Sequence, residues 1–382
     1  MSDGGLDILH VTSAHGVTDT RIFVKQARSL AAAGYRVGVL GPGSAPETVS
    51  KDGVWLRRLK RPSGRLGRFT WFRKTLYKHI LEVGPRIVHL HDPDLLLMLP
   101  RLKRAGIKVI YDAHEDFSQA PVSRDWLGPR WMRRCAAWGL DMFERRHAAL
   151  ADGVVVADEQ LLPRFGGAHV VRNFLVASEW PISPVRPRAS HLRCIYVGDI
   201  TRARGALRMC DAVRAGREHG LPLHLDFVGP VAPSLRTDLE AHPARPHITV
   251  HGALSRVDVA TRMAKADVAL CLPEPLPAYR SSLPVKLLEY FAMGLPVVAT
   301  DTPRLRAEGR LAKGLKLVPW EAPAPQLVAA IQSAQNLADQ ARADLRATVM
   351  RDFNWSQEQA VLLGLYSEVL PEFEPIEAHA AE

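Results

Sequence analysis

One stretch of this chain encodes a loop, a helix and a buried strand in immediate succession: Ser281-Ser-Leu-Pro-Val-Lys-Leu-Leu-Glu-Tyr-Phe-Ala-Met-Gly-Leu-Pro-Val-Val-Ala-Thr-Asp301. Pro284 suits the first helical turn, because its missing N–H needs no partner there. Gly294 suits the left-handed residue that ends a helix. The apolar run that follows predicts a short strand. A helix leading directly into a buried strand is typical of an α/β fold with a parallel sheet.

Lys286 and Glu289 lie on one face of this helix, at i and i+3. A helix N-terminus beside a lysine favours a phosphate, because the free N–H groups and the dipole both attract an anion. A carboxylate one turn along can accept hydrogen bonds from a ribose diol. The same spacing is typical of a solvated surface ion pair, so both interpretations stay open here. The candidate site includes the preceding loop residues Ser281, Ser282 and Leu283.

Length and composition predict a two-domain soluble protein. The 382 residues exceed one ordinary core, and 47% hydrophobic with 24% charged residues is ordinary for a globular chain. The sequence has no apolar run long enough to span a membrane and no secretory signal. The four cysteines are far apart and show no metal or disulfide spacing. We therefore expect a cytoplasmic protein.

The formal net charge of +10 is unevenly distributed. Residues 51–81 carry ten Lys or Arg and one Asp among five aromatic residues, and residues 124–147 repeat this character. Such a surface suits nucleic acid, anionic lipid or a phosphorylated substrate, and it is equally typical of an ordinary solvated face. No nucleic-acid recognition motif accompanies it. We expect no specific nucleic acid, and peripheral contact of 51–81 with the inner face of an anionic membrane.

Strands and helices alternate twice along the chain. The first series occupies residues 1–180 and the second 188–352, with a proline-containing linker between them at 178–190. This pattern predicts an α/β fold of two doubly wound Rossmann-like domains that face each other across a cleft, where such sheets bind ligands at their carboxyl strand ends.

Polar residues follow the predicted strands of the first domain. After the first strand come His15, Gly16, which permits close backbone approach, and Asp19, which suits a helix N-cap. His91 and Asp92 end another strand; two histidines two residues apart suggest a metal, but no third ligand has suitable spacing, and hydrogen bonding to sugar hydroxyls fits better.

Two further groups complete the candidate site. His114 lies between Asp112 and Glu115, where carboxylates can tune an imidazole for proton transfer. In the second domain Arg202 and Arg204 follow a strand and can clamp a diphosphate in bidentate fashion. The surrounding turn is neither a Walker loop nor a dinucleotide fingerprint, which disfavours an ATPase or a dehydrogenase.

In this order, these segments resemble the family 4 type of retaining glycosyltransferase with the GT-B fold, also described as glycosyl transferases group 1. The resemblance rests on His10-Val-Thr-Ser-Ala-His15, Ile87-Val-His-Leu-His-Asp-Pro93, Tyr111-Asp-Ala-His-Glu115, Val197-Gly198 with Arg204-Gly205, Pro284–Val297 and Phe353-Asn-Trp355. The first domain would be the acceptor side and the second would bind the nucleotide-sugar donor. A final helix at about 356–370 would pack back onto the first domain.

The resemblance implies transfer of a sugar from a nucleoside diphosphate to a hydroxyl acceptor on a glycan, a lipid-linked molecule or a small molecule. Anomeric configuration would be retained, polysaccharide biosynthesis is the expected context, and neither a metal nor a cofactor is expected. His114 and Glu289 would be the catalytic residues, with Glu289 also holding the ribose.

The remaining roles implied by the resemblance are contacts with the two substrates. Lys286 and Arg204, with Arg202, would hold the diphosphate, and His15 and Gly16 would approach it. His91, Asp92 and Asp19 would contact the sugar or the acceptor.

Two alternatives remain open. One is a nucleotide-sugar epimerase of similar two-domain architecture, which needs no acceptor. The other is a non-catalytic nucleotide-sugar-binding scaffold, because Ser281 and Asp199 stand where the family often has Glu and Arg or Lys.

Overall fold

The structure is a computed structural model that describes residues 5–114, 117, 121, 128–181, 191–276, 279–280, 282–337 and 339–372. The chain forms two compact units, one of residues 1–173 with 355–382 and one of residues 174–354. The division falls earlier than the boundary near 180 expected from sequence, because Leu175 and Trp180 are buried in the core of the second unit. Most of the expected linker, residues 182–190, lies outside the described residues.

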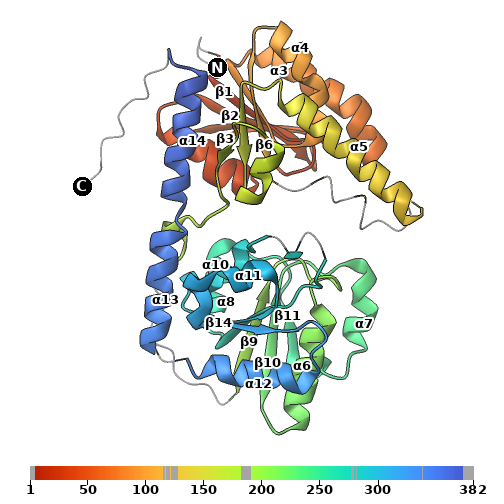
Figure 1. Cartoon of the computed structure of the whole chain (residues 1–382), viewed down its shortest axis with the longest axis vertical. Helices are drawn as coiled ribbons and strands as arrows, with labels where there is room; N and C mark the ends of the chain where they lie inside the picture. The colour runs from red at the N-terminus through yellow and green to blue at the C-terminus, as the bar shows by residue number, and fades with distance from the viewer. Residues whose placement is uncertain are drawn as a thin grey trace. The chain divides into compact units, whose positions relative to one another are not determined.

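The amino-terminal domain contains an eight-stranded sheet in the order β3-β4-β2-β1-β5-β6-β7-β8 (Figure 1). Its strands are β1 (Ile8–Val11), β2 (Val37–Gly43), β3 (Glu47–Lys51), β4 (Val54–Lys60), β5 (Ile87–Leu90), β6 (Lys108–Ala113), β7 (Gly153–Val156) and β8 (His169–Val170). All neighbours pair in parallel except β3 and β4. The parallel part confirms the Rossmann-like domain expected from the apolar runs.

Helical segments connect these strands. They are η1 (Thr20–Ala27), α1 (Arg28–Ala32), α2 (Gly64–Gly67), η2 (Arg68–Phe72), α3 (Arg73–Val83), η3 (Pro93–Met98), α4 (Leu99–Arg104), α5 (Arg130–Ala148), η6 (Glu159–Arg164) and α14 (Trp355–Val369). Although α14 ends the described chain, it belongs to this domain: Trp355 Nε1 donates to Ser29 Oγ at 2.8 Å, and the Tyr366 hydroxyl lies 2.7 Å from His89 Nδ1.

The basic stretch 51–81 is not a uniform surface. Its first ten residues are mostly β4, whose Val54, Leu56 and Leu59 are buried. Phe72 is also buried, and Trp55 packs against the same core. The β3–β4 hairpin was not predicted, because its charged residues mask the apolar alternation of an edge strand.

The carboxy-terminal domain is built on a six-stranded parallel sheet in the order β11-β10-β9-β12-β13-β14. Its strands are β9 (Leu192–Val197), β10 (Leu223–Val228), β11 (Ile248–Val250), β12 (Val268–Cys271), β13 (Val297–Thr300) and β14 (Leu315–Val318). The strand order reverses beside β9, so the ends of β9 and β12 mark the topological switch point at which such sheets bind ligands.

The helical segments of this domain are η7 (Ala177–Glu179), α6 (Ala206–Glu218), η8 (Pro233–Leu235), α7 (Arg236–Glu240), η9 (Arg245–His247), α8 (Arg256–Ala264), α10 (Val285–Ala292), α11 (Pro303–Ala307), η10 (Gly309–Gly314), α12 (Ala324–Gln335) and α13 (Asp339–Asp352). The opening stretch folds as expected: Pro284 caps α10, Gly294 is left-handed with φ 68°, and β13 follows. The sequence pattern of residues 325–352 predicts one long amphipathic helix, but the stretch is divided into α12 and α13.

In the part of the chain that the structure describes, no helix has the length and apolar character needed to cross a bilayer.

Candidate active site

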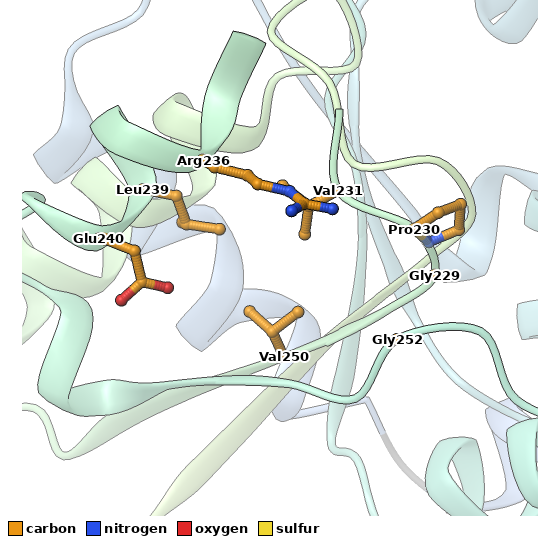
Figure 2. Close-up of a pocket in the computed structure, with 8 residues that line it drawn as sticks. All are labelled: Gly229, Pro230, Val231, Arg236, Leu239, Glu240, Val250 and Gly252. Carbon is orange, nitrogen blue, oxygen red and sulfur yellow. The ribbon is translucent and has the colours of Figure 1, made fainter. Parts of the chain in front are cut away.

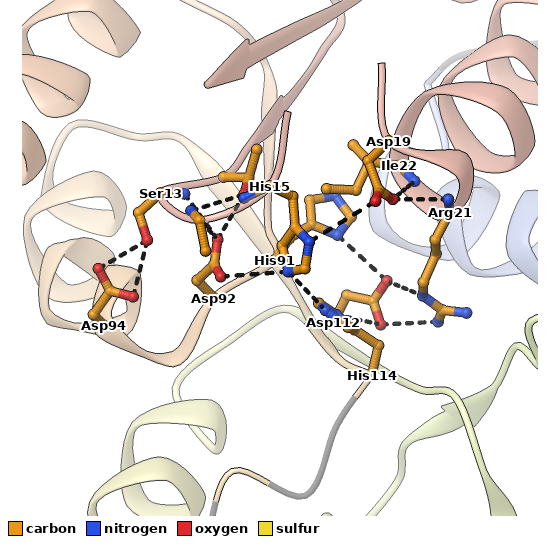
Figure 3. A network of polar contacts seen from close by, with 12 residues as sticks. Ser13, His15, Asp19, Arg21, Ile22, His91, Asp92, Asp94, Asp112 and His114 are labelled. Carbon is orange, nitrogen blue, oxygen red and sulfur yellow. Dashed lines mark hydrogen bonds and ion pairs between the residues drawn. The ribbon is translucent and has the colours of Figure 1, made fainter. Parts of the chain in front are cut away.

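In the amino-terminal domain, side chains from the ends of β1, β5 and β6 converge on one polar network (Figure 3). Asp92 Oδ2 accepts hydrogen bonds from Thr12 Oγ1 at 2.7 Å and from Ser13 N at 2.8 Å. His15 Nε2 lies 3.8 Å from Asp92 Oδ1. The carboxylate therefore holds the loop after β1 in place and places His15 beside it.

His114 joins this network after β6. Its Nε2 lies 3.3 Å from His15 Nε2, and its Nδ1 lies 4.0 Å from Asp112 Oδ1. Burial lowers the pKa of His114, an effect that the nearby Asp112 carboxylate opposes. The imidazole is therefore held neutral at physiological pH, with one nitrogen able to donate and one to accept a hydrogen bond.

Asp112 and Arg21 form a buried ion pair beneath these histidines. Arg21 Nε and Nη2 donate to the two Asp112 oxygens at 2.8 and 2.9 Å. Burial alone would raise the pKa of Asp112, but Arg21 and a hydrogen bond from His91 hold it well below its ordinary value. The carboxylate thus stays charged and orients the rings around it.

This ion pair leads to a stability prediction. Arg21→Ala would leave Asp112 charged, buried and without its main partner, so we expect a loss of about 3–5 kcal/mol in the free energy of unfolding. Arg28→Ala is the control, because Arg28 Nε lies 3.5 Å from Asp52 Oδ2 on the surface and should contribute less than about 1 kcal/mol. Urea unfolding measures both; equal losses would contradict this account of the site.

His91 and Asp19 have positions that define their roles. His91 is fully buried, with Nε2 2.9 Å from His10 Nδ1 and Nδ1 3.4 Å from Asp112. Asp92 is equally buried. In this structure both side chains are enclosed by protein. Their burial favours a role in positioning neighbouring side chains over the direct sugar contact expected from sequence. Asp19 caps η1 by accepting from Arg21 N and Ile22 N, as its sequence position suggested.

Two triplets of described residues offer metal-ligating atoms within 4.8 Å of one another: His10, His89 and His91, and His91, Asp112 and His114. The rings of the first triplet stack with interplanar angles of 20–29°, and His10 Nδ1 and His91 Nε2 already share a hydrogen bond at 2.9 Å. In the second triplet, the Asp112 oxygens already bind Arg21.

In the carboxy-terminal domain, Lys286 projects from the first turn of α10 towards the end of β9. Its Nζ donates to the Tyr196 hydroxyl at 2.9 Å and lies 4.3 Å from the centre of that ring. Gly198 leaves room for it, since a Cβ there would lie 2.9 Å from Nζ. Burial lowers the pKa of Lys286 to about 8, with Cys271 opposing the shift and Arg204 adding to it.

Arg204 shares this site, whereas Arg202 does not. Arg204 interacts with Tyr196, and its Nη2 lies 4.0 Å from Asp199 Oδ2. Arg202 pairs instead with Asp238 on α7. The turn requires glycine at 205, which is left-handed with φ 78° and whose added Cβ would meet Leu272 O at 1.9 Å.

Glu289 lies one turn further along α10. Its Oε1 is 3.7 Å from Arg256 Nη1, which also lies 2.8 Å from Glu179 Oε2. Of the expected loop residues, Ser282 is exposed and Leu283 packs against the core. Ser281, like Glu115 in the other domain, lies outside the described residues.

Gly16, the remaining expected residue, is exposed, and a Cβ there would meet nothing within 4 Å. Protein packing therefore does not require glycine at this position. The space beside its backbone is open to a ligand.

A cavity of about 370 Å³ opens at the ends of β10 and β11 (Figure 2). Its lining residues are Gly229, Pro230, Val231, Arg236, Leu239, Glu240, Val250 and Gly252. It adjoins the cationic site, because Gly229 lies against the backbone of Gly198. Glu240 accepts from Arg245 Nε at 2.9 Å, and Arg236 contributes a positive charge to the lining of the cavity.

Sequence reasoning missed several contributors. Tyr196 lies within an apolar strand, and Arg256 begins a helix that contains no functional motif. No sequence pattern therefore indicated that either residue belongs to the site. Asp112 lies inside the quoted motif Tyr111–Glu115 and Arg21 lies two residues after Asp19, but their pairing across 91 residues is visible only in the fold.

Solved structures match this chain along nearly its whole length. Sucrose-phosphate synthase of Thermosynechococcus elongatus is 18% identical with a TM-score of 0.74, covering 96% of this chain and 99% of that one. WaaG, a glycosyltransferase involved in lipopolysaccharide biosynthesis, is 17% identical with a TM-score of 0.68 over 94% and 99%. HepE of Anabaena in complex with UDP is 13% identical with a TM-score of 0.65 over 95% and 100%.

At these identities the likeness shows the fold, which is that of the GT-B class of glycosyltransferases. Residues 20–175 match the glycosyl transferase 4-like domain, and residues 191–336 match the glycosyl transferases group 1. The chain is therefore a glycosyltransferase with the GT-B fold. No curated protein gives a significant match.

Proposed function

We propose that the carboxy-terminal domain binds the diphosphate of a nucleotide sugar through Lys286 and Arg204. The observation that carries this proposal is the pair of cations beside Tyr196, at the switch point of a parallel sheet and the start of α10. Two like charges held together with partial burial are costly unless an anion neutralises them. HepE, which shares the fold, has been solved with UDP and with UDP-glucose.

The proposed reaction transfers the sugar to a hydroxyl acceptor with retention of anomeric configuration. The bond between the anomeric carbon and the diphosphate oxygen breaks, and the acceptor oxygen bonds to that carbon from the same face. The leaving diphosphate oxygen takes the acceptor proton. Lys286 and Arg204 stabilise the departing charge, Glu289 holds the ribose, and neutral His114 hydrogen-bonds to the transferred sugar.

We propose that this chemistry needs no divalent metal, because two side-chain cations and the N-terminus of α10 face the same anion. Transfer should therefore continue in EDTA. Loss of activity in EDTA that magnesium or manganese restores would overturn this part of the proposal.

The lowered pKa of Lys286 predicts a pH dependence for donor binding. Below about pH 8 the lysine is protonated and attracts phosphate; as pH rises through 8 it loses its charge and the dissociation constant should increase, by up to about tenfold per pH unit. Binding near pH 8 should therefore take up protons, measurable by calorimetry in buffers of different ionisation enthalpy. Lys286→Arg should flatten the profile, and an unchanged slope in that variant would contradict the assignment.

A thermal-shift screen tests donor binding. Nucleoside diphosphates and their sugars should raise the unfolding temperature of the wild type by ligand linkage, and Lys286→Met should abolish the shift. Lys313→Met is a matched control, since Lys313 is exposed on the same domain. The binding proposal fails if no nucleotide shifts the wild type or if both variants respond alike.

A further inference from the structure

The helix α5 (Arg130–Ala148) is poorly covered by the rest of its domain. Of its 19 residues only Glu144 and Ala148 are buried, both in its carboxy-terminal part. Figure 1 shows the other end of this helix extending away from the sheet. A wholly polar, solvated surface would explain such exposure, but the exposed residues here include the large apolar side chains of Trp131, Met132, Trp138 and Met142.

The exposed residues form an apolar stripe along α5. Trp131, Cys135, Trp138 and Met142 follow one another at i, i+4, i+7 and i+11, which places them on one face of a helix. Both tryptophans are 66% exposed and Met142 is 47% exposed. Among the described residues nothing covers this stripe, although exposed aromatic residues of this size usually mark an interaction surface.

Arginines border the stripe. On the helix surface Arg134 and Arg145 lie along one edge and Arg146 along the other. Asp141 lies 3.6 Å from Arg145 Nη1 and also accepts from Arg164 Nε at 2.8 Å, while the buried Glu144 accepts from the Tyr111 hydroxyl at 2.7 Å. Among the described residues Arg134 and Arg146 have no acidic partner, so their charges remain on this face. The face is therefore apolar at its centre and positive at both edges.

We propose that this face of α5 docks on the surface of an anionic lipid bilayer. Tryptophan prefers the boundary between headgroups and acyl chains, and flanking arginines interact with anionic headgroups. A helix with an apolar face and basic borders lies in the plane of that boundary without crossing it. The proposed docking surface is thus α5, which lies outside the 51–81 stretch that was expected from sequence to contact a membrane. Within 51–81, Phe69 and Trp71 are the only aromatic residues that are largely exposed.

The charges argue against a second copy of this chain as the occupant. The stripe has the spacing of a coiled-coil seam, and two copies would bury it. Pairing two such faces would bring the unpaired charges of Arg134 and Arg146 from both copies together, because Asp141, the acidic residue beside the stripe, already contacts Arg145 and Arg164. An anionic surface complements both edges at once.

Vesicle co-sedimentation of the full chain tests this inference independently of the catalytic proposal. Wild-type protein should bind vesicles that contain phosphatidylglycerol and should release with added salt, with weak binding to pure phosphatidylcholine. Trp131→Ser/Trp138→Ser should reduce the partition by about tenfold or more. Arg134→Glu/Arg146→Glu should reduce it by at least about fivefold per residue.

Phe69→Ser/Trp71→Ser is the matched control, since it removes two exposed aromatics from the same domain and should retain binding. The variants should keep their unfolding temperature, because the replaced side chains are exposed. Equal partition of wild type and the α5 tryptophan variant overturns the inference, as does equal binding to neutral vesicles. A concentration-dependent dimer that this variant abolishes, without vesicle binding, would instead assign the face to a second copy.

Discussion

Replacing His114 with alanine is expected to reduce glycosyl transfer by about 10²–10⁴-fold. The neutral His114 imidazole lies beside Asp112 and His15, and in the proposed mechanism it hydrogen-bonds to the transferred sugar. Nucleotide affinity should be unchanged, because the diphosphate is assigned to the other domain. Initial rates measured alongside calorimetric titration of the nucleoside diphosphate separate these two effects.

His147→Ala is a suitable control, because His147 Nδ1 lies 2.7 Å from the Phe143 carbonyl on α5, away from the network. It should retain wild-type turnover. His114→Ala with normal turnover would remove His114 from the site. If His114→Ala loses transfer and also unfolds at a lower temperature, His114→Asn is the variant to measure next, because asparagine keeps a hydrogen-bonding group.

Replacing Glu289 with alanine is expected to weaken nucleoside diphosphate binding by about 10–100-fold. Hydrogen bonds from a ribose diol to a charged carboxylate contribute about 1.5–3 kcal/mol, and Glu289 is the carboxylate on the helix that carries Lys286. Removing it also leaves Arg256 without one of its two carboxylate neighbours. Calorimetric titration with the nucleoside diphosphate measures the loss.

The assignment of Glu289 to the ribose also predicts that the protein distinguishes ribose from 2′-deoxyribose. A 2′-deoxy nucleotide should lose affinity for the wild type but much less for Glu289→Ala, because the missing hydroxyl no longer has a partner in that variant. Glu218→Ala is the control, since Glu218 pairs with Arg214 on the surface of α6 in the same domain. Unchanged affinity in Glu289→Ala would refute the role of this residue.

Much of the fold was predictable because a parallel sheet buries its strands on both faces. Val268–Cys271 is wholly apolar and Val297–Thr300 is apolar up to its last residue, so both runs are visible in sequence. The β3–β4 hairpin was missed for the opposite reason: it lies at an edge, where Glu47–Lys51 is almost entirely exposed and has a charged residue at each end. The break between α12 and α13 lies within a stretch of helix-forming residues that carries no proline or glycine signal.

The site residues that follow strands were predictable from sequence. Residues whose role depends on a tertiary ion pair or hydrogen bond were less so. His15 and His114 were expected after β1 and β6, and the fold brings their Nε2 atoms to 3.3 Å from each other. Adjacent arginines, by contrast, look alike in sequence, but the turn directs Arg202 to Asp238 and leaves Arg204 beside Tyr196. Only tertiary structure distinguishes them.

The most direct test of the central claim is the fate of the sugar on a nucleotide-sugar donor that the protein binds. NMR should show release of the nucleoside diphosphate and a transferred or hydrolysed sugar that initially keeps the anomeric configuration of the donor. Lys286→Met should release almost none. A donor whose sugar is epimerised while its phosphate bond stays intact, or one that binds and remains unchanged with every hydroxyl acceptor supplied, would contradict the account.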